Sequence, residues 1–68
     1  METFKIKGEF IQLNQLIKAM GWVDNGAAAN ELIDKGQIKV NGAIEHRKRN
    51  KLLVGDKINF GKKEVTIE

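Results

Sequence analysis

The sequence contains no cysteine, no proline and no serine, and its single histidine is His46. Without cysteine, neither a disulfide framework nor a thiolate zinc site can stabilise so small a chain. One imidazole cannot form a histidine metal cluster, so we expect no metal and no other cofactor. The sequence also lacks paired carboxylates placed for acid–base chemistry and a glycine-rich phosphate loop. We therefore do not expect an enzyme.

Long apolar runs are also absent. No stretch approaches the roughly 18 residues that a membrane-spanning helix requires, so no membrane partner is expected. The N-terminal segment METFKIKGEF lacks the apolar centre of a secretory signal, which favours a cytoplasmic protein. A chain of 68 residues allows one domain, residues 1–68, and is too short to enclose a typical pocket for a small-molecule substrate. We expect it to be a monomer.

Hydrophobic periodicity predicts a strand followed by a helix. Thr3–Lys7 alternates, with Phe4 and Ile6 on one face, as in a half-buried strand. The period then becomes helical, and the helix ends at Gly21. Its apolar stripe consists of Leu13, Leu16, Ile17 and Met20.

A second helix is predicted after a short link. Asp24 or Asn25 is a suitable N-cap, and Lys35 followed by Gly36 is typical of a helix C-terminus. The two helices form a hairpin. The small residues 26–29 allow the first turn of the second helix to approach either the first helix or a phosphate backbone closely. The helical spacing is carried by Ala29, Leu32 and Ile33.

From Gln37 onward the period returns to two, which predicts several short antiparallel strands. Asn41-Gly42 is a strong hairpin signal, because both turn positions require positive φ. The order of elements predicts an α+β domain in which a two-helix hairpin packs on a small, mostly antiparallel twisted sheet. Ile38 and Val40 are expected to face inward, and Leu52, Leu53 and Val54 to be buried. Further strands are expected over residues 43–45, over Lys57–Phe60, and at the end of the chain with Val65 and Ile67. A loop is expected over residues 46–50, and turns at Gly55-Asp56 and Gly61-Lys62.

The aromatic residues are interpreted mainly as core. Phe4, Phe10 and Phe60 follow the apolar periods and are expected to be buried. Trp22 is the only tryptophan; it either packs between the helices or stacks on a nucleobase, and we favour packing. His46 is interpreted as a loop residue.

Basic residues concentrate in one part of the chain. Residues 35–51 contain six lysines and arginines against Glu45 alone, a charge of +5, whereas the other residues sum to −2. Such a cluster favours an anionic partner, because lysine and arginine contacts to phosphates release counterions. A solvated loop that serves solubility is the alternative interpretation. The six residues are Lys35, Lys39, Arg47, Lys48, Arg49 and Lys51.

Three short motifs follow one another in a characteristic order. They are Leu32-Ile33 at the end of the second predicted helix, the strand and turn GQIKVNG at residues 36–42, and GDKI at residues 55–58. In this order and spacing the chain resembles the ribosomal protein S4-like RNA-binding domain family over roughly residues 11–60. The closer resemblance is to small stand-alone bacterial members of the YaaA/YbcJ kind. These have a Ser-Gly-[GA] turn at helix two, where this chain has Asn25-Gly26-Ala27 with asparagine in place of the more usual serine. They also have a basic run ending in Lys-[LI], matched by residues 47–52.

The resemblance implies the alpha-L RNA-binding motif and structured RNA as the partner, either rRNA or tRNA, with a role in translation or ribosome biogenesis. Larger members place an arginine and a glutamate near the start of helix two, where this chain has Gly26 and Ala28, so contacts there must differ and could use backbone N–H groups. Two alternatives remain open: a module whose basic face docks an acidic protein, and an accessory subunit that delivers RNA to an enzyme. The implied RNA-binding residues are Asn25, Gly26, Lys35, Gln37, Lys39, Arg47, Lys48, Arg49 and Lys51.

Overall fold

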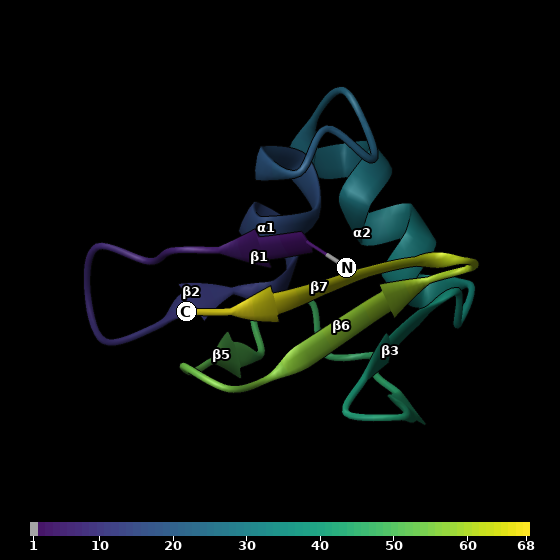
Figure 1. Ribbon diagram of the computed structural model, residues 1–68. Helices are drawn as coiled ribbons and strands as arrows, with labels where there is room; N and C mark the ends of the chain where they lie inside the picture. Colours follow the sequence, from purple (N-terminus) through teal and green to yellow (C-terminus); the bar gives the residue numbers. More distant parts are fainter. Residues whose placement is uncertain (1) are drawn as a thin grey trace.

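The computed structural model describes residues 2–68, which form a helical hairpin on one face of a sheet (Figure 1). The predicted α+β class and the two-helix hairpin are confirmed. The elements are β1 (Glu2–Phe4), β2 (Ile11–Gln12), α1 (Leu13–Ala19), α2 (Gly26–Asp34), β3 (Ile38–Val40), β4 (Ala43–Ile44), β5 (Lys51–Leu52), β6 (Lys57–Phe60) and β7 (Lys63–Ile67).

The start of α2 and the ends of both helices lie where local chemistry predicts. Asn25 is the N-cap of α2, and its side-chain oxygen accepts a hydrogen bond from the Ala28 N–H at 2.8 Å. This bond satisfies one of the N–H groups that a helix start leaves without an intrahelical partner. Gly21 and Gly36 follow the two helices with φ of 74° and 71°. This left-handed conformation stops a helix and favours glycine.

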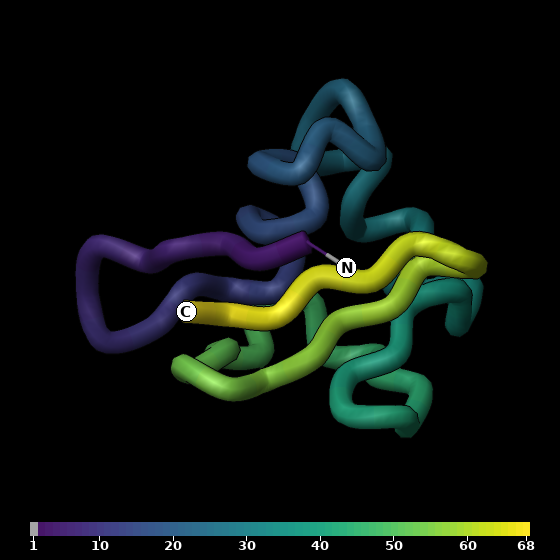
Figure 2. The backbone as a smooth tube through the Cα atoms, viewed as in Figure 1, coloured from purple at the N-terminus to yellow at the C-terminus, as the bar shows by residue number. Residues whose placement is uncertain are grey.

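The main sheet has five strands in the order β1-β7-β6-β3-β4. Its pairs are antiparallel except β1 with β7, which is parallel. That pairing places the first and last strands side by side (Figure 2). The predicted strand over Thr3–Lys7 is shorter and earlier in the structure, Glu2–Phe4. Beyond it, the Ile6 N–H still bonds to the Glu68 carbonyl at 3.1 Å.

A second, two-stranded sheet pairs β2 with β5 and was not predicted. Ile11 pairs with Leu52 and Gln12 with Lys51. Each strand has only two residues, too few for alternation to be recognised in the sequence. This small sheet joins the segment before α1 to the end of the basic loop.

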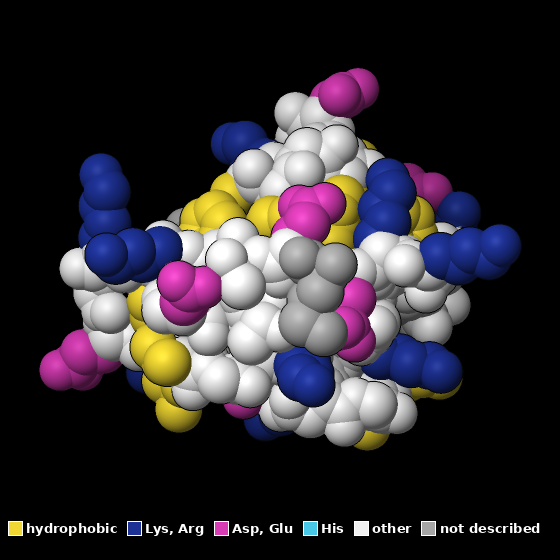
Figure 3. Space-filling view, viewed as in Figure 1, with side chains coloured by type: hydrophobic (Ala, Val, Ile, Leu, Met, Phe, Trp, Pro, Cys, Tyr) yellow, Lys and Arg dark blue, Asp and Glu magenta, His cyan; other side chains and the backbone are white. Residues whose placement is uncertain are grey.

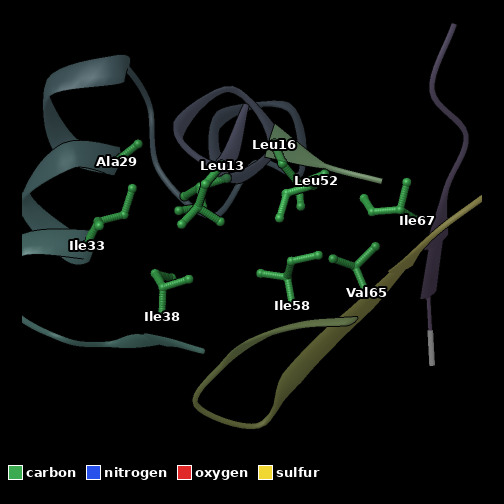
Figure 4. Packing of buried hydrophobic residues seen from close by; sticks show 10 residues of the cluster. Leu13, Leu16, Ala29, Ile33, Ile38, Leu52, Ile58, Val65 and Ile67 are labelled. Carbon is green, nitrogen blue, oxygen red and sulfur yellow. The ribbon is translucent and has the colours of Figure 1, made fainter. Parts of the chain in front are cut away.

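The core lies between the helices and the sheets (Figure 4). Among residues 2–68, ten hydrophobic residues have no more than 1% of their surface exposed. Burial of each leucine, isoleucine or valine side chain adds about 1.5–3 kcal/mol to the stability of the folded state. Trp22 packs from the edge of this core, as predicted, but its ring contact is with Phe60 of β6, at 5.8 Å between ring centres, whereas a place between the helices was expected. The ten residues are Leu13, Leu16, Ile17, Ala29, Ile33, Ile38, Leu52, Ile58, Val65 and Ile67.

Three residues expected in the core lie at the surface. Leu53 is 54% exposed and Val54 68%, so only Leu52 of that apolar triplet is buried. Phe10 is 41% exposed, although a core position was predicted. Leu52, the last residue of β5, points inward, and Leu53, directly after the strand, points outward because successive side chains of an extended backbone alternate.

The motif residues at the two turns bind each other. Asn41 has φ of 52° and Gly42 of 87°, which confirms the predicted positive-φ turn. The Asn41 amide donates to Asp56 at 3.1 Å, and its oxygen accepts from the Lys57 N–H at 2.9 Å. The Asn-Gly and Gly-Asp motifs therefore form one structural unit that joins the start of β6 to the β3–β4 hairpin.

Candidate nucleic-acid interface

Backbone hydrogen bonds hold the basic loop, residues 46–50, against the start of α1. The Leu13 N–H donates to the Asn50 carbonyl at 2.9 Å, and the Asn14 N–H donates to the Lys48 carbonyl at 3.0 Å. Helix α1 has no side-chain cap, so these carbonyls satisfy N–H groups that the helix leaves free. The loop is thereby attached to the helical hairpin.

The same loop contacts the end of α2. The Lys48 ammonium lies 3.2 Å from the Asp34 carboxylate in the last residue of that helix. A Cβ placed on Gly36, just beyond α2, would lie 3.4 Å from the His46 ring. The helices are linked by a hydrogen bond of 3.2 Å from the Asn14 amide to Asn30. The start of α1, the end of α2 and the loop therefore meet at one place.

Five of the predicted RNA-binding residues surround this meeting point, and we name them the basic junction. The loop contributes three of them, the α2 C-cap one and β5 one. The arginines of the loop, Asn50 and Lys51 line an open hollow of about 400 Å³. The basic junction consists of Lys35, Arg47, Lys48, Arg49 and Lys51.

The other predicted residues lie elsewhere. Gln37 is exposed just after α2, while Lys39 lies on β3 and lines a separate hollow with Asn59. Asn25 and Gly26 are at the opposite end of α2, about 12 Å from its last residue at the helical rise per residue. The Asn25 side-chain oxygen already caps the helix. A Cβ on Gly26 would meet nothing within 4 Å, so packing against α1 does not require glycine there.

Three cations of the basic junction have carboxylate partners. Lys35 pairs with Glu31 at 2.8 Å, Arg47 with Glu45 at 3.0 Å, and Lys48 with Asp34. Five cations against three carboxylates leave a charge of +2. The count of +5 over residues 35–51 missed Glu31 and Asp34, because these precede that window on α2. Within residues 2–68, Arg49 and Lys51 have no ion pair.

These ion pairs shift the pKa values of their members. The side-chain hydrogen bond from Arg47 lowers the pKa of Glu45 to about 2, and the same bond raises the pKa of Arg47. The hydrogen bond between Glu31 and Lys35 lowers the pKa of the carboxyl group and raises the pKa of the ammonium group. All four groups therefore stay charged near neutral pH.

The face that carries β1 and β7 has a mixed charge, unlike the basic junction. Figure 3 shows lysines and arginines interspersed with aspartates and glutamates there. Lys62, for example, lines a hollow with Glu2 and Glu64. No group of three or more metal-ligating side chains occurs among residues 2–68, and no helix in that range is long and apolar enough to cross a membrane.

One residue beside the basic junction was not predicted as part of a site. The Lys51 ammonium lies 4.8 Å from the centre of the Phe10 ring, within cation–π distance. The apolar character of Phe10 favoured a core position, and the strand pairing that turns it outward is not visible in the sequence.

Comparison with known proteins identifies the class. The S4 domain family matches residues 4–68, so this chain belongs to the S4 domain family. It is 40% identical over 68 residues to “Putative RNA-binding protein YbcJ” of Escherichia coli (strain K12), covering 98% of this chain and 97% of that protein. “Uncharacterized protein YbcJ” of Shigella flexneri matches with the same identity and coverage.

A solved structure supports the same assignment. The solution structure of E. coli YbcJ, described as revealing an alpha-L motif involved in RNA-binding, is similar with a TM-score of 0.74 at 40% identity. The similarity covers 98% of this chain and 86% of that one. The predicted resemblance to the S4-like family and its small bacterial members is confirmed, as is the alpha-L fold.

Proposed function

We propose that this protein binds structured RNA through the basic junction and the helical hairpin. The observation that carries the proposal is the docking of the basic loop on both helices, through Leu13, Asn14 and Asp34. Arg47, Arg49 and Lys51 line one open hollow, and docking places the loop beside Lys35 at the end of α2, so these cations can contact several phosphates together. Membership of the S4 domain family and the RNA-binding description of the E. coli relative support it.

The finer proposal is that the RNA is rRNA or tRNA and that a cytoplasmic monomer acts in translation or ribosome biogenesis. A-form RNA presents its phosphates and a wide, shallow minor groove, so recognition by shape suits a small charged surface. Gln37 and Lys39 would extend the contact along the sheet. Asn25 and Gly26 would provide a second contact, through backbone N–H groups at the start of α2.

A salt titration of RNA binding tests this function. With four or five phosphate contacts, the slope of log K against log salt is about −3 to −4. Arg49→Gln should make the slope less negative by about 0.7–0.9, because Arg49 has no carboxylate partner among residues 2–68 and lines the hollow. Lys62→Gln makes the same charge change away from this hollow and should alter the slope less. A flat salt dependence, or no binding to hairpin RNA, would leave the acidic-protein alternative.

A further inference from the structure

The outer face of the sheet β2–β5 carries an exposed aromatic ring beside the basic junction. The Ile11–Leu52 pair faces the core, so the flanking residues Phe10 and Leu53 face outward. The position of the Lys51 ammonium over the Phe10 ring places Lys51 on this outer face as well. A planar apolar surface and a cation are therefore adjacent.

Exposed large hydrophobic side chains concentrate at this end of the molecule. Residues 2–68 contain four of them, and three lie on or beside the outer face of β5: Phe10, Leu53 and Val54. Hydrophobic side chains gather over the β5–β6 turn at the lower left of Figure 3. Scattered single hydrophobics need no explanation, but a contiguous group with a polar rim is typical of a binding surface.

Two open hollows with cations in their lining lie at the Phe10 ring. Lys51, whose ammonium lies over the ring, lines the first together with Arg47 and Arg49. Phe10 itself lines the second, of about 320 Å³, together with Lys5 and Lys7. An aromatic side chain within a positively charged path is the arrangement that binds unpaired nucleotides, since the base stacks and the phosphates pair with the cations.

The geometry points to Phe10 as a stacking platform for one unpaired nucleobase of the bound RNA. Arg49 and Lys51 in the first hollow, and Lys5 and Lys7 in the second, hold the neighbouring phosphates. This inference rests on the proposed function and narrows the ligand to an RNA helix that ends in, or is interrupted by, unpaired nucleotides. In the free protein the Lys51 ammonium covers one face of the ring. When the Lys51 ammonium pairs with a phosphate instead, this face of the ring becomes free to stack on the base.

Two RNAs test the inference: a blunt-ended hairpin, and the same hairpin with a single-stranded tail that contains 2-aminopurine. Wild-type protein should bind the tailed RNA more tightly and change the 2-aminopurine fluorescence through stacking. Phe10→Leu keeps an apolar side chain but removes the aromatic face. It should weaken binding of the tailed RNA by about 5- to 150-fold and leave blunt-hairpin binding unchanged. Phe10→Trp should retain the preference for the tailed RNA over the blunt hairpin. Val54→Ala, which removes apolar surface from the same group but no aromatic ring, is the control and should also retain it.

The outcomes separate this inference from the proposed function. The stacking role would be overturned if Phe10→Leu bound the tailed RNA as tightly as the wild type does. It would also be overturned if the variant lost affinity equally for both RNAs. A wild-type protein that binds both RNAs equally would also overturn it, while the proposed function would stand. Absence of salt-dependent binding to either RNA would overturn both. Unchanged binding of the blunt hairpin also shows that the variant is folded.

Discussion

The Arg47 guanidinium donates two hydrogen bonds of 3.0 Å to the Glu45 carboxylate, from Nε to Oε2 and from Nη2 to Oε1. The Arg47 side chain is 76% exposed and that of Glu45 only 17%. The Arg47 backbone N–H also donates to Glu45 at 3.0 Å. Glu45 thus orients the first cation of the basic loop and at the same time competes with any phosphate for it.

This competition predicts that Glu45→Gln strengthens RNA binding. The amide oxygen can still accept the Arg47 backbone N–H, while the guanidinium becomes free to pair with a phosphate. We expect an affinity gain of about 3-fold, in the range of one exposed ion pair, and a slope of log K against log salt more negative by about 0.7–0.9. Fluorescence anisotropy with a labelled RNA hairpin measures both.

Glu2→Gln removes the same charge from the hollow that Lys62 lines. It should raise the affinity less and leave the slope unchanged. An unchanged slope for Glu45→Gln would mean that Arg47 makes no phosphate contact.

The same pair predicts how stability depends on pH. Because the pKa of Glu45 is about 2 in the folded protein, against an ordinary 4.5, its ionised form stabilises the fold above about pH 4.5. That contribution is lost as the pH falls toward 2. The loss should be at most about 1 kcal/mol, the upper range for an exposed ion pair. Urea unfolding followed by Trp22 fluorescence measures it.

Glu45→Gln is the reference, since it keeps every other titrating group. The difference in free energy of unfolding between wild type and variant should shrink as the pH falls from 5 to 2. A difference that stays constant over this range would contradict a role for the ionised carboxylate in stability.

Features governed by local chemistry were predictable from the sequence. The cap at Asn25, the glycines that end the helices and the turn at Asn41-Gly42 depend on residues within a few positions of one another. The helical stripe of α1 could be recognised for the same reason, because Leu13, Leu16 and Ile17 repeat with the helical period.

Features that depend on distant pairing were not predictable. The parallel β1–β7 pair joins residues about sixty positions apart, and β2–β5 joins two strands of two residues each. Without the β2–β5 register, the sequence does not show that Phe10 and Leu53 face solvent. The ion pair between Lys48 and Asp34 could not be predicted for the same reason. The charge counted over residues 35–51 therefore overstated the charge of the basic junction.

The division of the apolar triplet predicts unequal effects of two neighbouring substitutions. Leu52→Ala leaves a cavity where β5 packs on the core and should lower the free energy of unfolding by about 2–5 kcal/mol. Leu53→Ala should change it by less than about 0.5 kcal/mol, because that side chain is already largely in solvent. Urea unfolding of both variants at one pH provides the comparison. Similar losses for the two would mean that the outer face of β5 is covered in solution.

The start of α2 gives a test that separates folding from binding. Gly26 has neither a positive φ nor any atom within 4 Å of an added Cβ. Gly26→Ala should therefore raise the free energy of unfolding by about 0.4–1 kcal/mol, through reduced freedom of the unfolded chain. If RNA phosphates approach the N–H groups at this end of α2, the added methyl group weakens RNA binding in a more stable protein.

Asn25→Ser is the companion variant, because serine retains the capping oxygen without adding bulk. It should keep both stability and RNA affinity close to those of the wild type. Urea unfolding and RNA anisotropy on the same preparations give the two quantities independently. Wild-type RNA affinity in Gly26→Ala would remove the start of α2 from the RNA-binding surface. The contact would then be left to the basic junction at the other end of α2, with Gln37 and Lys39 beside it.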